Sequence, residues 1–216
     1  MVTIFDRITS PENLLIAWQE FIKGKSRKLD VQEFNLHLME NIFLLRNELV
    51  SRSYKHGAYQ RFNICDPKQR RIHKAEVKDR VLHHAIFGII HPIFEKMFIP
   101  SSFSCRIGYG THKGVAALER MTKKVSQNGT KQCFALKCDI RKFFDSVDHD
   151  RLLEIIKKRI KDKDVLWLLQ GIIESYVVTP ERERERERER ETMRAAQKGH
   201  THWQSYFPAF RQCLYE

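Results

Sequence analysis

The stretch Phe134-Ala135-Leu136-Lys137-Cys138-Asp139-Ile140-Arg141-Lys142-Phe143-Phe144-Asp145 decides how the chain is interpreted. Its first residues are typical of a buried strand, which Gln132 to Asp139 are expected to form. The strand ends in the Asp139 carboxylate, and a basic pair and two aromatic rings follow. A rigid strand that delivers a carboxylate to a solvent-open end suits a metal site. The same pattern also fits a carboxylate that caps the strand or the next helix, so the stretch alone leaves both interpretations open.

The composition favours a polyanionic partner. The 216 residues suffice for one large domain or two small ones, and 42% of them are hydrophobic. The net charge of +12 points to nucleic acid first and to an acidic membrane surface second. No stretch approaches the ~20 apolar residues that span a bilayer. The N-terminus lacks the pattern of an export signal, so a cytoplasmic location is expected. The five cysteines form no C-x-x-C pair, which favours reduced thiols over a disulfide framework or a zinc site.

The hydrophobic spacing predicts a helix-rich α+β chain. Ser10 and Pro11 form a helix start, and Asp30 with Glu33 resembles a capping box. Asp148 is expected to cap a later helix. The expected helices are 10–24, 30–51, 76–98, 113–127, 148–160 and 165–176. A hairpin is expected from strands 58–65 and 70–74, with its turn at 66–69.

Two segments have basic residues where an anion could bind. The hairpin is basic at Arg61, Lys68, Arg70, Arg71 and Lys74, which suits phosphate oxygens but also suits an edge strand kept soluble by charge. The glycine loop 104–112 would let backbone N–H groups approach an anion or a template strand, although a plain turn fits equally well. His83, His84 and His91 lack metal-ligand spacing and are interpreted as solvated or core histidines.

Four blocks of sequence, taken together, resemble the amino-terminal half of bacterial reverse transcriptases. The resemblance extends from about Tyr54 to Tyr176 and is strongest to the group II intron-like branch, which includes diversity-generating retroelement and retron-like enzymes. The blocks are Asp66-Pro67-Lys68-Gln69-Arg70-Arg71-Ile72, Asp79-Arg80-Val81-Leu82-His83-His84-Ala85, Ser104-Cys105-Arg106-Ile107-Gly108-Tyr109-Gly110-Thr111-His112 and Asp139-Ile140-Arg141-Lys142-Phe143-Phe144-Asp145-Ser146-Val147-Asp148-His149. They occur in the order and at the spacing of that family.

The resemblance implies the fingers and the first half of the palm of a right-hand polymerase. It implies an N-terminal helical segment at 1–53, fingers at 54–130, a partial palm at 131–178 and a remaining tail at 179–216. Asp139 would be the first catalytic carboxylate and would bind Mg²⁺, with the Ile140 carbonyl as a second oxygen ligand. Arg70 would grip the incoming triphosphate and Phe144 would exclude a ribose 2′-hydroxyl. The template or nucleic-acid side would include Lys68, Arg71, Arg106, Gly108 and Gly110.

The implied activity is RNA-directed DNA polymerisation, a magnesium-dependent nucleotidyl transfer. The implied partners are an RNA template, a nucleic-acid primer, deoxynucleoside triphosphates and a retroelement accessory protein, with no membrane. The chain departs from the family, however, because it has neither the G-x-P-x-G segment nor the aromatic-x-Asp-Asp hairpin. One carboxylate cannot hold two divalent ions, so we expect this chain to be inactive. A non-catalytic RNA-binding remnant is the alternative, and a basic fragment that partly misfolds is a third interpretation.

A Glu-Arg repeat occupies 181–191, after the last matching residues. It has no apolar residue to bury and is expected to be a solvated helix or a disordered run. Alternating Glu and Arg is what an iterated GA dinucleotide encodes, and the gain or loss of one two-base unit shifts the reading frame. The chain is therefore expected to be a frameshifted, truncated product whose tail is out of frame.

The coding DNA tests this expectation directly. Residues 198–216 are compatible with codons that, read one base later, spell K-G-I-P-I-G-N-L-T-S-Q-L-F-A-N-V-Y-M, which contains the G-x-P-x-G pattern. The second glycine is forced, because the Trp203 codon followed by any Gln204 codon gives GGC in that frame. We expect sequencing of codons 180–216 to show a GA repeat followed by this string one base later. Any other string in that frame would refute the frameshift.

Overall fold

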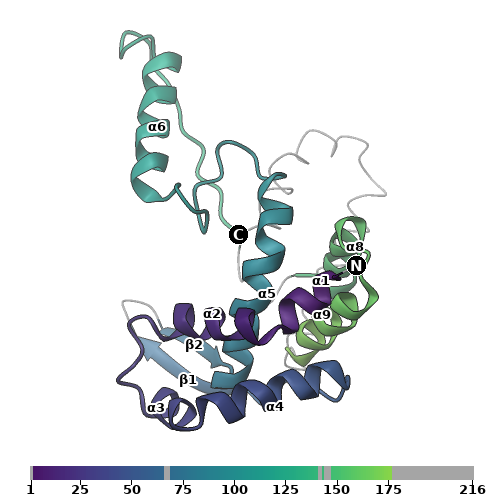
Figure 1. Ribbon diagram of the computed structural model, residues 1–216. Helices are drawn as coiled ribbons and strands as arrows, with labels where there is room; N and C mark the ends of the chain where they lie inside the picture. Colours follow the sequence, from purple (N-terminus) through teal and green to yellow (C-terminus); the bar gives the residue numbers. More distant parts are fainter. Residues whose placement is uncertain (1, 66–68, 141–142, 144–146, 177–216) are drawn as a thin grey trace, which may run out of the picture. The chain divides into compact units, whose positions relative to one another are not determined.

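The structure is a computed structural model that describes residues 2–65, 69–140, 143 and 147–176 (Figure 1). The described chain divides into two compact units. The first combines Met1–Ile93 with Leu153–Tyr176, and the second contains the described residues of Phe94–Leu152. Within the described ranges the elements are eight α-helices and one two-stranded antiparallel sheet. The expected helix-rich α+β organisation is thereby confirmed. The expected 179–216 tail lies outside the described residues.

The first unit opens with two helices that are capped by neighbouring side chains. In α1 (Ile4–Thr9), the Asp6 amide donates to the Thr3 hydroxyl at 3.0 Å, and the Thr3 amide donates back to the Asp6 carboxylate at 2.9 Å. In α2 (Pro11–Ile22), the Asn13 amide donates to the Ser10 hydroxyl at 3.2 Å. The helix start expected at Ser10 and Pro11 is confirmed, because a hydroxyl before a proline satisfies an otherwise orphaned amide.

The helix expected over 30–51 is divided into two. Helices α3 (Leu29–Leu36) and α4 (Leu38–Val50) meet at His37, whose φ of −118° interrupts the helical backbone. The expected capping box at Asp30 is wrong, since Lys28 precedes the helix and makes no side-chain cap. The Asp30 carboxylate instead forms ion pairs with Lys74 at 2.7 Å and with Arg80 at 2.6 Å. Two cations attract a carboxylate more strongly than one backbone amide does.

The hairpin forms as expected from β1 (Gln60–Cys65) and β2 (Gln69–Lys74). Its antiparallel register sets Gln60 opposite Lys74 and Cys65 opposite Gln69. Residues 66–68 of the expected turn lie outside the described residues. Helix α5 (Val77–Glu95) follows and includes Pro92, in agreement with the helix expected over 76–98.

The two last helices begin at aspartate caps, of which the cap at Asp148 was predicted. Asp148 accepts hydrogen bonds from the amides of Asp150 at 3.1 Å and Arg151 at 3.2 Å, at the start of α8 (His149–Arg159). Asp162 accepts from the amides of Asp164 and Val165 at the start of α9 (Lys163–Ser175). Its second oxygen accepts from the Phe5 amide at 2.9 Å, so α9 is tied to α1.

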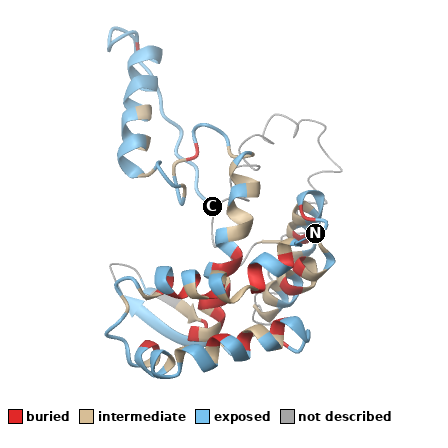
Figure 2. Cartoon of the chain, in the orientation of Figure 1, coloured by how far each residue is buried: buried red, intermediate tan, exposed pale blue. Residues whose placement is uncertain are grey.

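The core of the first unit is built from the apolar faces of α2, α4, α5 and α9 (Figure 2). Its members with at most 1% of their surface exposed in these helices are Leu14, Phe21, Ile42, Leu45, Leu49, Val81, Leu82, Ala85, Val165 and Leu168. Burial of the Val, Leu, Ile and Phe side chains among them contributes about 1.5–3 kcal/mol each to folding. No helix in the described ranges is long and apolar enough to cross a bilayer.

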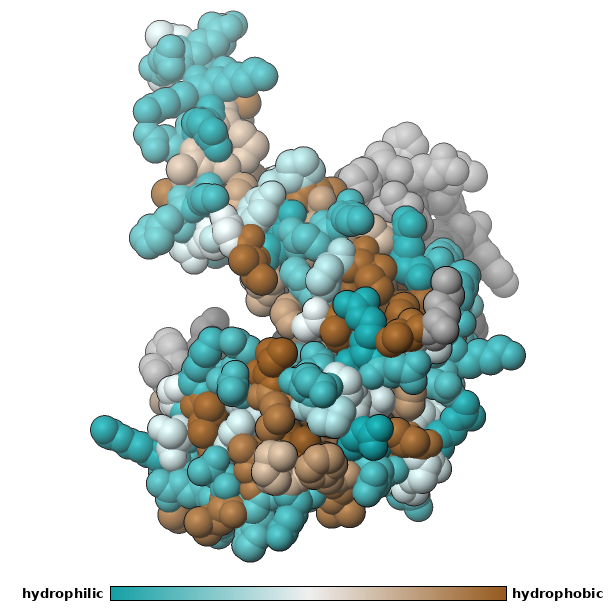
Figure 3. Space-filling view, in the orientation of Figure 1, coloured by the Kyte–Doolittle hydropathy of each residue, from teal (hydrophilic) through white to brown (hydrophobic). Residues whose placement is uncertain are grey.

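The second unit has little core among its described residues. Helix α6 (Thr111–Val125) has no buried residue, and Val115, Leu118, Met121 and Val125 are at least half exposed. In the space-filling view, hydrophilic side chains cover much of the visible face of α6 (Figure 3). Among the described residues of 94–152, the buried ones are the two serines Ser102 and Ser126.

The strand expected from Gln132 to Asp139 is wrong. These residues have no regular secondary structure, and Phe134 and Leu136 are 89% and 90% exposed. A strand requires a neighbour that accepts and donates its backbone hydrogen bonds. No segment in the described part of the chain pairs with residues 132–139.

The core can be tested at Leu45, which is fully buried in α4. Leu45→Ala should lower the free energy of unfolding by about 2–5 kcal/mol, because it leaves a cavity in addition to the lost burial. Leu36→Ala is the control, since Leu36 is 78% exposed and the same truncation there should change the free energy by under ~1 kcal/mol. Urea denaturation measures both, and equal losses would contradict this core.

Candidate functional site

The hairpin presents the first group of predicted nucleic-acid contacts. The register places Arg70 opposite Ile64 and Arg71 opposite Asn63 in the ladder. Arg61 is exposed on β1, whereas Lys74 is held by the ion pair with Asp30. Lys68 lies outside the described residues. The structure therefore confirms the basic hairpin, while phosphate binding by Lys68, Arg70 and Arg71 stays a prediction.

A buried carboxylate fixes the segment that leads into the hairpin. Asp79 in α5 is fully buried, and its two oxygens accept from the Tyr54 hydroxyl at 2.7 Å and the Gly57 amide at 3.0 Å. Burial, together with the hydrogen bond to Asp79, raises the pKa of the Tyr54 hydroxyl well above its usual value. A charge can be buried only with such partners, so this network sets the path of residues 54–57.

Asp79 was not singled out from the sequence, although a signal was present. It lies three and seven residues before Leu82 and Ile86, on the apolar face of α5. A charged residue at such a position indicates a buried, hydrogen-bonded carboxylate rather than a solvated one.

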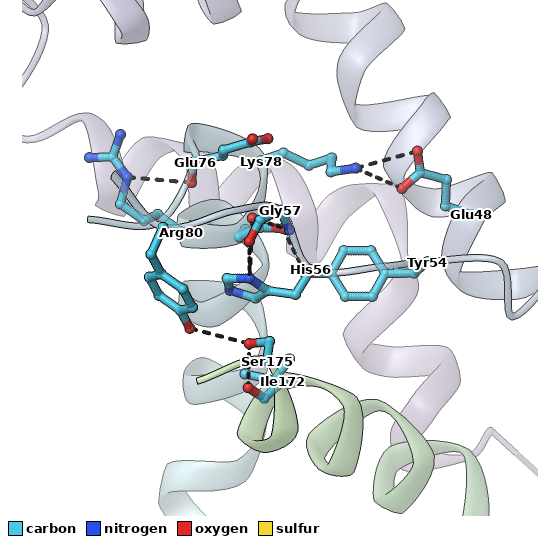
Figure 4. A network of polar contacts seen from close by, with 11 residues as sticks. Glu48, Tyr54, His56, Gly57, Glu76, Lys78, Arg80, Ile172 and Ser175 are labelled. Carbon is cyan, nitrogen blue, oxygen red and sulfur yellow. Dashed lines mark hydrogen bonds and ion pairs between the residues drawn. The ribbon is translucent and has the colours of Figure 1, made fainter. Parts of the chain in front are cut away.

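Two histidine rings stack beside this carboxylate. The His56 Nδ1 lies 3.7 Å from an Asp79 oxygen and 2.7 Å from the Gly57 carbonyl oxygen, and the His56 side chain is 1% exposed. The His56 ring is stacked on Tyr59 and His83, with ring centroids 4.8 and 5.3 Å apart. Figure 4 shows His56 beside Gly57, and nearby the ion pair of Lys78 with Glu48. His83 is thus a packed histidine, as interpreted from its spacing.

The glycine loop is held together by Arg106. Its guanidinium forms an ion pair with Glu95 at 2.8 Å and donates to the carbonyls of Ile99 at 3.1 Å and Ser102 at 2.9 Å. It also lies 3.8 Å from the centre of the Tyr109 ring, a cation–π contact. Its side chain is 7% exposed. Arg106 therefore has a role in shaping the loop, and a contact with a template stays a prediction.

Gly108 and Gly110 give the loop its conformation. Their φ angles of 77° and 117° lie in the region that side-chain-bearing residues rarely adopt, and Gly110 directly precedes α6. The glycines are therefore required by the backbone. Whether they also border a template or nucleotide stays a prediction.

Asp139 lies at the end of the irregular segment 132–140, exposed to solvent, and Ile140 is half-buried. Phe144 lies outside the described residues. No group of three or more His, Cys, Asp or Glu among the described residues could hold a metal ion. One carboxylate and one carbonyl do not fit a pair of Mg²⁺ ions, which take six oxygen ligands each. The described residues at this position therefore support no catalytic step through magnesium.

Comparison with curated proteins gives distant relatives. The chain is 28% identical to nuclear intron maturase 1, mitochondrial, of Arabidopsis thaliana over 110 residues, which are 50% of this chain and 14% of that protein. It is 23% identical to nuclear intron maturase 2 of the same plant over 161 residues, which are 67% of this chain and 21% of that protein. It is 25% identical to Protein YkfC of Escherichia coli over 61% of this chain and 35% of that protein.

These matches show that the chain is distantly homologous to intron maturases and related proteins. No protein-family model matches it. The chain spans at most about a third of the length of the relatives just described. This distant homology covers part of each relative, and it does not show a catalytic activity for this chain.

The histidine stack predicts an acid-sensitive first unit. Burial lowers the pKa of His83 to about 4, and the neighbouring His56 and His84 add to this, while Asp79 opposes it. The unfolded state, with an ordinary pKa near 6.5, binds the proton first. The free energy of unfolding is therefore highest above about pH 6.5. It falls by up to about 3 kcal/mol as the pH decreases towards 4, because the unfolded state takes up the proton first.

The measurement is the free energy of unfolding against pH. His83→Gln should show a shallower loss of stability between pH 6.5 and 4.5 than the parent chain. His112→Gln, at an exposed position, should keep the parent's slope. A His83→Gln slope equal to the parent's would contradict the assignment of His83 as a buried neutral histidine.

Proposed function

We propose that the chain is the amino-terminal part of a reverse transcriptase of the group II intron-like branch. The observation that supports this most is the distant homology to intron maturases, which adds to four sequence blocks in the family's order. In this proposal the hairpin and α5 belong to the fingers, and the segment around Asp139 is the first part of the palm. The RNA template, primer and deoxynucleoside triphosphates are the proposed substrates.

The proposed roles follow the sequence blocks. Asp139 is the first metal-binding carboxylate of the complete enzyme, with the Ile140 carbonyl beside it. Arg70 and Phe144 contact the incoming nucleotide. The nucleic-acid side includes Lys68, Arg71, Arg106, Gly108 and Gly110. The chain as written has no further Asp after Asp164, so we infer that it does not polymerise.

A second function, non-catalytic RNA binding, is favoured by the charge of the chain. Its net charge of +12 and exposed basic residues suit the phosphate backbone, which requires no metal site. Binding of this kind is sequence-independent and weakens steeply with salt. It would remain in a chain that has lost the catalytic carboxylates.

Primer extension in Mg²⁺ separates the two functions. With a primer annealed to an RNA template and all four deoxynucleoside triphosphates, we expect no extension by this chain. Incorporation that disappears in Asp139→Ala and not in Asp150→Ala, a nearby exposed carboxylate, would show instead that the chain is itself a polymerase.

RNA binding is expected to depend on the hairpin. Arg61→Ala should weaken binding of single-stranded RNA and reduce the slope of log affinity against log salt by about one, as loss of one phosphate contact does. Arg7→Ala is the matched control, since it removes one exposed arginine from α1. Fluorescence anisotropy over a salt series measures both. Equal effects of the two variants would argue against binding at the hairpin.

A further inference from the structure

A pocket of about 340 Å³ lies within the first unit, between residues 54–56 and helix α9. This volume is in the range of small-molecule sites. The pocket is separate from the residues that the sequence blocks assign to nucleotide, metal or template. Its lining residues are Tyr54, Lys55, His56, Trp167, Leu168, Gly171, Glu174 and Ser175.

Gly171 keeps the α9 side of the pocket open. A Cβ atom built at Gly171 would have no heavy atom within 4 Å. Glycine inside a helix is unfavourable compared with other residues, because it costs more backbone entropy. Its position here leaves space beside Trp167, the largest of the lining side chains.

One wall of the pocket is fixed by the packing of His56. Its ring is stacked on Tyr59 and His83, and its Nδ1 lies 2.7 Å from the Gly57 carbonyl oxygen. The side chain is 1% exposed and its Nε2 is buried, so the ring shapes the wall and offers no hydrogen bond to a ligand in the pocket.

A cation lies at the same pocket. Lys55 is exposed and forms no ion pair with any described residue. The Glu174 carboxylate already accepts from Gln170 at 2.7 Å, and the Ser175 hydroxyl donates to the Ile172 carbonyl at 2.6 Å. The pocket thus offers an aromatic residue and an exposed ammonium group that pairs with no described residue.

We propose that this pocket binds an unpaired nucleobase of an RNA strand together with its phosphate. The base would stack on Trp167, and the phosphate would pair with Lys55. Nucleic-acid binding without strict sequence preference combines aromatic stacking with basic groups in this way. The net charge of +12 favours an anionic ligand over a neutral heterocycle. The inference rests on the proposed function, since that function supplies the RNA.

The test fills the pocket with an added side chain. Gly171→Leu removes the open space, and leucine also favours the helix more than glycine does. Gly88→Leu in α5 is the matched control, because Gly88 is also an exposed helical glycine with no heavy atom within 4 Å of a built Cβ. It lies outside the pocket lining. Circular dichroism confirms that both variants keep the helical content of the parent chain.

The probe is a short single-stranded RNA carrying the fluorescent base 2-aminopurine, compared with the same strand containing an abasic site. Gly171→Leu should weaken binding of the intact strand by about tenfold, the usual effect of losing one base–aromatic stack. It should leave binding of the abasic strand unchanged, and Gly88→Leu should change neither. Lys55→Ala should weaken both strands and reduce their salt dependence.

The outcomes distinguish this inference from the proposed function. If the parent chain binds RNA and Gly171→Leu binds the intact strand equally well, the pocket inference fails and the proposed function stands. If the parent chain binds no RNA at all, the pocket inference fails together with the proposed RNA binding. Adenosine and guanosine monophosphates form a further arm. Their binding at affinities equal to the RNA strand would show that the pocket takes free nucleotides and would overturn the assignment to RNA.

Discussion

The buried carboxylate of Asp79 is the constraint on which the first unit depends. A fully buried charge requires donors from elsewhere, and the structure supplies them from Tyr54 and Gly57, with the His56 ring alongside. These donors lie in the segment between α4 and the hairpin. The same bonds therefore attach the segment that leads into the hairpin to α5. They also fix the His56 ring at the pocket wall, so the position of the proposed ligand site follows from satisfying one carboxylate.

Much of the local structure could be predicted from the sequence, because it depends on neighbours in the chain. A hydroxyl before Pro11 and a carboxylate at Asp148 cap helices through bonds to residues two or three positions away. The hairpin is likewise a local element. Helix α1 is short and escaped prediction, although Thr3 and Asp6 cap it reciprocally. Its apolar pattern covers too few turns to give a periodic signal.

Distant contacts account for what could not be predicted. Asp30 has the spacing of a cap, but Lys74 and Arg80 from later elements attract it away from the helix start. The apolar run at 132–139 has strand composition and no pairing partner among the described residues, so it stays irregular and exposed. Arg106 has the position of a template contact, and its donors are used by Glu95 and two loop carbonyls. In each case the residue's chemistry was evident while the identity of its partner was not.

The tie between the first and last helices has a consequence for how the protein is made. The Phe5 amide donates to Asp162, and Arg52, just after α4, pairs with Asp164, so both segments contact the start of α9. A ribosome synthesises the chain from its N-terminus. Helices α1, α2 and α4 can pack on one another early, but the part of α1 that contacts α9 must wait until nearly all of residues 1–176 have been translated. This first unit is accordingly completed only when the last described helix has left the ribosome.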